Sequence, residues 1–163
     1  MSGLARFLII VALLAGASRS ALAEVRVPVV AVFELQDATG RQKRLVAGLT
    51  DYLRVKLAET RLVKVVDKGD QEAQLKRLVA AERKSSYRAC VDESCQIPLG
   101  KELAADRILR GKITRFGKQH VIALEMVDLA SGASTGAASD KSDGTEESLM
   151  ASIERVANLI TQD

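Results

Sequence analysis

The sequence predicts an α/β (α+β) domain in which a mixed β-sheet of about five strands packs against three or four helices. Two observations support this fold class. Short apolar runs alternate with amphipathic stretches in the first half of the chain, and the second half contains a long hairpin followed by a helix. The expected order of elements is therefore β-α-β-α-(α)-β-β-β-α. Aromatic residues make up only 3% of the chain, so its core must be built from Val, Leu, Ile and Ala.

The first half of the chain predicts two strands, each followed by a helix. Residues 25–35 form a nearly continuous apolar run, which is typical of a strand covered on both faces. Thr39 and Gln42 have the spacing of a capping box. The next apolar residues recur every four positions on one helix face, namely Leu45, Leu49, Leu53 and Leu57. A short strand at 62–66 ends at Asp67, a residue type that caps helices. The helix after it should bury Leu75, Leu78 and Val79.

The second half predicts three strands. Residues 107–116 and 120–129 should form a hairpin that turns at 117–118. Alternate residues of the second strand should face the core, namely Ile122, Leu124 and Met126. A third strand is expected at 133–140. The sheet should therefore end in an antiparallel meander.

Turn and cap residues mark the ends of these last elements. Asp128 can accept from the backbone two residues on, and Gly132 tolerates a positive φ, so 128–132 predicts a tight turn. Asp143 and Glu146 match a capping box at the start of the final helix. The buried stripe of that helix should consist of Leu149, Ile153, Val156 and Ile160.

Residues 1–23 have the organisation of a secretory signal peptide. A basic start at Arg6 is followed by an apolar run at 7–16 and by the A-x-A pattern that ends at Ala23. A retained membrane anchor is the alternative, but a spanning helix needs roughly 20 apolar residues, about twice the length of this run. We therefore expect cleavage between Ala23 and Glu24, which leaves one domain at 24–163 in the periplasm and no stable membrane span.

Removal of the signal peptide changes the charge of the protein. The chain has 24 Lys and Arg residues against 21 Asp and Glu residues. The signal peptide holds Arg6, Arg19 and no acidic residue, so the mature domain has 22 against 21, a net charge of +1. A nearly neutral domain has no large field that would steer it onto nucleic acid or anionic lipid. No base-stacking aromatic residues accompany its basic clusters, so no nucleic-acid partner is expected.

Cys90 and Cys95 are separated by four residues. In an oxidising compartment such a pair forms a local disulfide, which here would hold the start of a helix that carries Leu99 and has Pro98 in its first turn. A redox-active pair is the alternative, although redox motifs have two intervening residues. Two cysteines and a single histidine, His120, do not complete a tetrahedral zinc site.

No set of catalytic residues stands out. Any Ser–His–Asp or Cys–His arrangement would have to use His120, which is expected on the rim of a strand. The chain contains no phosphate-binding glycine loop and no G-x-S-x-G motif. We expect neither enzymatic activity nor a cofactor, with a small enzyme or thiol oxidoreductase as the alternative.

Several segments resemble a module of bacterial envelope proteins. They are the cysteine pair 90–95, the stretches 99–113 and 117–132, the first strand at 29–33, the helix segment 49–53 and the second strand at 65–67. Together they resemble the amino-terminal domain of TolB and its relatives, the curli secretion lipoprotein CsgG and the penicillin-binding protein activator LpoB. The resemblance covers nearly all of residues 25–160. It implies a periplasmic α/β domain that makes protein–protein contacts in an envelope machine.

The chain departs from these relatives in three respects. No cysteine follows the cleavage site at Ala23–Glu24, so the lipid attachment of CsgG and LpoB is not expected. The β-propeller of TolB is not expected for want of room. The hairpins of a secretion pore are not expected either, because the only good hairpin region, 107–140, is used by the domain sheet. We therefore expect an exported adaptor that binds envelope or periplasmic proteins, and association with the outer membrane stays open. The alternative is a self-associating, homo-oligomeric subunit of a secretion or motility assembly.

Export makes a testable prediction about the purified protein. Protein from the periplasm should begin at Glu24 by N-terminal sequencing, and alkylating reagents should label neither Cys90 nor Cys95 before reduction. Replacing both cysteines with serine should lower stability and preserve function, because a bridge over so short a loop contributes about 2–3 kcal/mol at most. A chain found in the cytosol with its leader intact and both thiols reduced would contradict this prediction.

Overall fold

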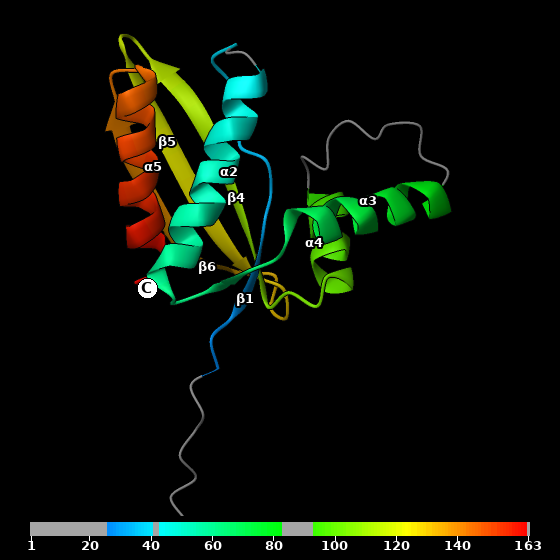
Figure 1. The fold of residues 1–163 in the computed structure, drawn as a ribbon. Coiled ribbons are helices and arrows are strands. Elements are labelled where there is room, and N and C mark those ends of the chain that lie inside the picture. The colour runs from blue at the N-terminus through cyan, green and yellow to red at the C-terminus, as the bar shows by residue number, and fades with distance from the viewer. Residues whose placement is uncertain (1–25, 41–42, 83–92, 163) are drawn as a thin grey trace, which may run out of the picture.

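The computed structural model describes residues 26–40, 43–82 and 93–162. They form one mixed β-sheet with helices on both of its faces (Figure 1). The predicted α/β class is confirmed, with six strands in the sheet and four helices in the described part of the chain.

The sheet combines a parallel and an antiparallel half. Its bounds are β1 Val29–Val32, β2 Gln36–Asp37, β3 Lys64–Val65, β4 Arg107–Phe116, β5 Gln119–Asp128 and β6 Ser134–Ser142. The strand order is β3-β1-β4-β5-β6, and β2 also pairs with β4. Strands β1, β2 and β3 run parallel to their neighbours, whereas β4, β5 and β6 form an antiparallel meander. The long hairpin expected from the sequence is therefore the centre of the sheet.

The helices divide between the two faces of the sheet. Their bounds are α2 Lys43–Thr60, α3 Lys68–Glu82, α4 Glu93–Glu102 and α5 Glu146–Ile160. Helices α2 and α5 lie side by side on one face, whereas α3 and α4 lie together away from them (Figure 1). The α2 and α5 side chains share a large apolar core with Val30 and Val32, and Leu99 of α4 packs in a smaller one with Ala31 and Phe33. Strand β1 is therefore buried on both faces, as its continuous apolar run predicts.

Buried backbone groups of β1 need partners within the protein because water cannot reach them. Its neighbouring strands supply most of them, and two charged side chains bind its ends. The Asp106 carboxylate accepts a hydrogen bond from the Val29 N–H at 2.8 Å. The Arg54 guanidinium donates to the Val32 carbonyl at 2.5 Å. Arg54 therefore joins α2 to the carboxyl end of the central strand.

The start of α3 has the cap that the sequence predicts. The Asp67 Oδ1 atom accepts from the N–H groups of Gly69 at 2.8 Å and Asp70 at 3.2 Å. Two amide groups that have no partner within the helix are satisfied in this way.

The predicted capping box of Asp143 and Glu146 is wrong. The N-cap of α5 is Thr145, whose hydroxyl oxygen accepts from the Ser148 N–H at 3.3 Å. The Asp143 carboxylate instead accepts from the backbone N–H and the hydroxyl of Thr145, both at 2.8 Å. Asp143 therefore orients the capping residue Thr145 and does not cap the helix itself.

The other predicted capping box, at Thr39 and Gln42, is only partly visible. Gln42 lies outside the described residues, and the Thr39 hydroxyl donates to Asp37 at 2.5 Å. The side chains of Leu78 and Val79 in α3 also lie outside the described part, whereas Leu75 packs against the smaller core.

The predicted position of Pro98 is wrong as well. Helix α4 begins at Glu93, so Pro98 lies inside the helix and not in its first turn. Proline has no N–H and removes one helical hydrogen bond at this position. The next residue, Leu99, is fully buried in the smaller core and keeps the helix on the sheet past the missing bond.

Gly111 makes a testable prediction about the packing of the sheet. A Cβ atom there would lie 2.5 Å from Leu124 Cδ2, 2.6 Å from Leu35 Cδ2 and 3.0 Å from the Ala123 carbonyl. Gly111→Ala should therefore lower the free energy of unfolding in urea by about 1–3 kcal/mol, because this core cannot accept an added methyl group without moving.

Gly48 is the matched control. It lies on the exposed side of α2, and a Cβ atom there would meet nothing within 4 Å. Gly48→Ala should raise stability by about 0.5–1 kcal/mol through helix propensity. Equal effects of the two substitutions would contradict the close packing at Gly111.

Candidate functional site

Most of one face of the antiparallel half of the sheet is not covered by any described helix, because α4 packs on it only at the end that holds Ile108 and Val127. Leu109, Ile113, Ile122, Leu124 and Met126 point toward α2 and α5, so the alternate residues point to the opposite side. We call this side the open face, and it consists of Arg110, Lys112, Thr114, Val121, Ala123, Glu125, Ala137, Ser139 and Lys141. The side chains in its middle are exposed to solvent, which shows that the face is bare.

Strand register arranges the open face in three rows that cross β4, β5 and β6. The rows are Arg110–Glu125–Ala137, Lys112–Ala123–Ser139 and Thr114–Val121–Lys141. Small side chains occupy the middle of the face, and a lysine lies on each of its outer strands. The surface is therefore flat in the middle and positively charged at two edges.

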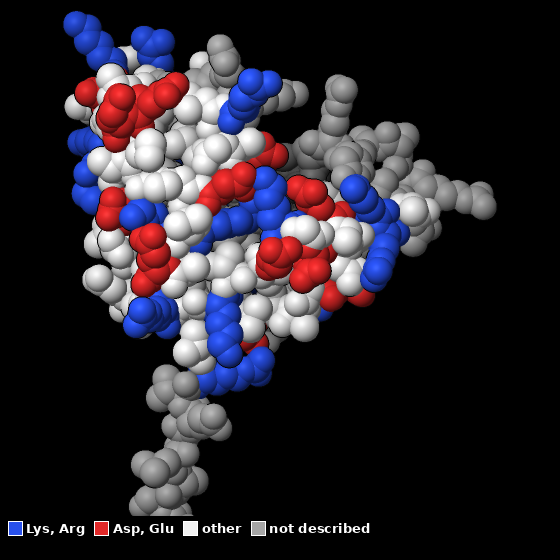
Figure 2. All heavy atoms as spheres, in the orientation of Figure 1, with Lys and Arg blue, Asp and Glu red and all other residues white. Residues whose placement is uncertain are grey.

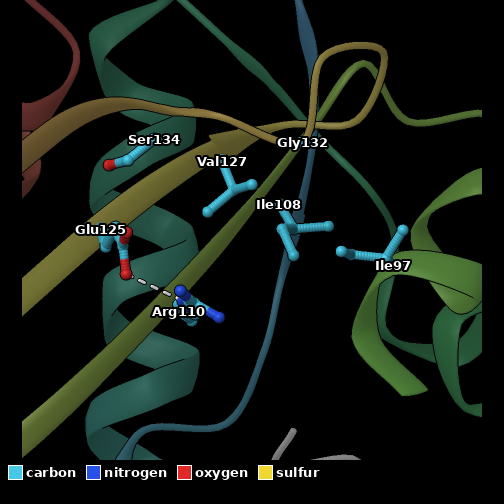
Figure 3. Close-up of a pocket in the computed structure, with 7 residues that line it drawn as sticks. All are labelled: Ile97, Ile108, Arg110, Glu125, Val127, Gly132 and Ser134. Carbon is cyan, nitrogen blue, oxygen red and sulfur yellow. Dashed lines mark hydrogen bonds and ion pairs between the residues drawn. The ribbon is translucent and has the colours of Figure 1, made fainter. Parts of the chain in front are cut away.

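A pocket of about 130 Å³ lies where the open face meets α4 (Figure 3). Ile108 and Val127 come from neighbouring strands, and Ile97 approaches them from α4. Arg110 and Glu125 line another side, and the remaining lining comes from Gly132 and Ser134. The pocket thus has apolar side chains of the strands and α4 on one side and the polar side chains of Arg110, Glu125 and Ser134 on the other.

The ion pair beside the pocket joins β4 to β5. The Arg110 Nε atom donates to Glu125 Oε2 at 2.9 Å, and both side chains are partly exposed. This hydrogen bond lowers the pKa of Glu125 below its ordinary value. Glu125 therefore stays negatively charged at neutral pH beside the guanidinium.

The turn beside the pocket is held by Asp128, as the sequence predicts for a turn residue. Its Oδ1 atom accepts from the backbone N–H and the hydroxyl of Ser131, at 2.8 and 2.7 Å, and from Ala130 N–H at 3.1 Å. The Ser131 backbone hydrogen bond is the main cause of a lowered pKa of Asp128. Gly132 completes the turn with a φ of +70°. Both residues therefore have structural roles at the end of the hairpin.

The other side of the molecule differs in charge. Where α2 and α5 lie in front of the sheet, acidic and basic side chains interleave (Figure 2). The ion pairs there include Lys56 with Glu154, and Arg155 with Asp140. Positive and negative charges are therefore mixed on this side, whereas the lysines of the open face are not paired with acidic residues of the described chain.

The remaining sequence-predicted site residues are not gathered at the open face. Ala23, Glu24 and Cys90 lie outside the described residues, and Cys95 is half-buried in α4. The Cys90–Cys95 bond therefore stays a prediction. His120 is half-buried at the start of β5, at the far end of that strand from the pocket.

Two further kinds of feature are absent from the described ranges. No His, Cys, Asp or Glu side chains gather there in a group able to hold a metal ion. None of the helices there is long and apolar enough to span a membrane.

The residues of the open face were not predicted from the sequence as a functional surface. A signal was present, because Arg110, Lys112 and Thr114 alternate with the buried Leu109 and Ile113 in β4. Alternation predicts which residues share a face, but it does not show whether a helix covers the polar side.

These features define a small α/β domain with a bare sheet face. The chain belongs to the family described as peptidoglycan-synthase activator LpoB, whose model matches residues 13–135. Of the three relatives in the expected resemblance, this family model names LpoB. No curated protein matches the chain.

Solved structures share the fold at low sequence identity. The C-terminal domain of LpoB from Escherichia coli is 16% identical with a TM-score of 0.59, and the match covers 82% of this chain and 92% of that one. The equivalent domain from Salmonella enterica is 14% identical with a TM-score of 0.58, over 71% and 82% of the two chains. The PelC dodecamer from Paraburkholderia phytofirmans is 12% identical with a TM-score of 0.54, over 83% and 89%. These likenesses show a common fold.

Glu125 makes a testable prediction about pH. Its pKa in the folded protein is lowered, so the folded state binds this proton less tightly than the unfolded chain does. The pair therefore stabilises the fold above the ordinary pKa of 4.5, and this stabilisation is lost as the pH falls through the lowered value. Glu125→Gln should cost less than about 1 kcal/mol at pH 7, because both partners are partly exposed.

Urea unfolding of both proteins between neutral and acidic pH measures this effect. The difference between wild type and Glu125→Gln should shrink well below pH 4.5. A double-mutant cycle with Arg110→Gln isolates the pair from other effects of each substitution. A difference that is constant with pH would refute the assignment.

Proposed function

We propose that this protein is a non-catalytic activator of a peptidoglycan synthase in the bacterial periplasm. The observation that carries the proposal is the family match over residues 13–135. Two LpoB C-terminal domains share the fold of this chain, which is consistent with the family match. The partner would be the synthase itself, bound through a protein surface.

The structure supports a role through contact in two ways. The open face offers small, exposed side chains on a hydrogen-bonded sheet, which suits docking of another protein. The ion pair of Arg110 with Glu125 on this face links β4 to β5. A scaffold of this kind acts by binding and positioning its partner.

The predicted signal peptide supports export of the proposed activator from the cytoplasm. Cleavage between Ala23 and Glu24 would release residues 24–163 as one domain, with the Cys90–Cys95 bridge formed in the oxidising compartment.

Self-association is a second candidate, which the likeness to the PelC dodecamer favours. Light scattering on the exported protein over a range of concentrations separates the two forms. A mass that stays monomeric throughout would exclude the assembly subunit.

The proposed function predicts a gain in synthase activity. Periplasmic protein added to a bifunctional peptidoglycan synthase from the same bacterium should raise the initial rate of glycan polymerisation from lipid II several-fold. The protein alone should convert no lipid II, and a heat-unfolded sample should have no effect. An unchanged rate at saturating protein would rule the proposal out.

A further inference from the structure

The residues of the open face differ from those of an ordinary solvated strand pair. Ala123, Ala137 and Ser139 in its middle are exposed and short, so another protein can approach the sheet closely. Lys112 and Lys141 border this strip from β4 and β6, and Lys141 lies one row further along. Neither lysine forms an ion pair with any described residue. The open face carries Arg110, Lys112 and Lys141 against Glu125, a net charge of +2 (3 − 1).

Protection against aggregation does not account for both lysines. Lysine on an edge strand prevents pairing with other chains, and Lys141 lies on the edge strand β6. Lys112 lies on β4, where β2 and β5 pair with both edges of the strand, so no edge needs protection there. Lys112 is exposed and unpaired among the described residues, and it lies on a strand in the interior of the sheet. It is therefore available to bind a negative charge.

The pocket at the end of the open face limits what enters it. Its volume of about 130 Å³ is close to the roughly 150 Å³ of an apolar cavity that holds one benzene molecule. One aliphatic side chain has a comparable size. Ile97 and Val127 would contact such a side chain on one side of the pocket, and the aliphatic parts of Arg110 and Glu125 would contact it on the other.

We propose that the open face docks an acidic surface of the synthase, with one aliphatic side chain of the synthase in the pocket. This inference rests on the proposed function and adds the docking surface and the chemistry of its partner. Partner carboxylates bind Lys112 and Lys141, while partner backbone packs on the alanine and serine strip.

The size of the open face sets the expected strength of binding. The open face spans five residues on each of three strands, roughly 15 by 17 Å or about 250 Å², from the usual strand spacing and rise. A standard interface buries about 800 Å² on each partner. The open face supplies about a third of this area, so we expect a modest affinity that weakens with salt, because charge pairs at the two lysines contribute to it.

The test compares two charge-reversed variants of the exported protein. Lys112→Glu/Lys141→Glu changes the open face, and Lys64→Glu/Lys76→Glu makes the same change of charge at exposed positions on β3 and α3. Dissociation constants for the synthase, measured by biolayer interferometry, should rise about 10-fold or more for the first variant and less than about 2-fold for the second. Equal losses would show general attraction between charges and overturn the proposed surface.

A third variant tests shape without a change of charge. Ala123→Trp adds bulk to the exposed middle of the face and should also weaken binding about 10-fold, with an unchanged circular dichroism spectrum. If the wild type activates the synthase and all three variants activate it equally well, this inference is overturned and the proposed function stands. No activation by the wild type would instead remove the proposed function.

A membrane surface is the other anionic partner that the lysines fit. Binding to phosphatidylglycerol vesicles, measured by co-sedimentation, should be the same for wild type and Lys112→Glu/Lys141→Glu. Vesicle binding that this variant loses, with synthase binding unaffected, would overturn the proposal in favour of a lipid surface.

Discussion

The structure depends on the burial of β1 on both faces. A strand without contact with water must find a partner for every backbone group, and each partner fixes the position of another element. Strands β3 and β4 pair with its two edges. Asp106 reaches the Val29 N–H from the start of β4, and Arg54 reaches the Val32 carbonyl from α2. Arg54 also lies within 3.4 Å of Gln71 in α3, so helices on both faces of the sheet meet at the end of this strand.

The bare face follows from where the chain runs after the central strands. Helices α3 and α4 cross from β3 to β4 and cover the parallel half of the second face, whereas α5 returns from β6 to the first face beside α2. Most of the antiparallel half therefore has a helix layer on one side only, since α4 reaches it just at Ile108 and Val127. Antiparallel sheets tolerate such a bare side when it is polar or small. Residues 134–142 meet this condition, since Ala137, Ser139 and Lys141 face outward.

The sequence predicted most elements because their apolar spacing is regular. Strand β4 has the expected bounds, and Ile122, Leu124 and Met126 face the core as period two requires. Asp67 was identified as a cap because one acidic residue lies between a strand and a helix. At α5, Asp143 and Thr145 are both capping residue types, and their mutual hydrogen bonds decide which of them is the cap. Pro98 was predicted in the first turn of its helix but lies inside α4. Proline lacks the N–H for one helical hydrogen bond, and burial of Leu99 offsets that loss.

The sequence by itself determined the class of fold, the strand that is buried on both sides and the absence of a familiar catalytic motif. Each of these depends on residue types at short spacings. Only the tertiary structure decided that Lys112 and Lys141 border one flat face and that Ile97 meets Ile108 and Val127 at a pocket. These residues come from separate elements, and a local pattern does not record whether a later helix will cover the sheet or leave it exposed.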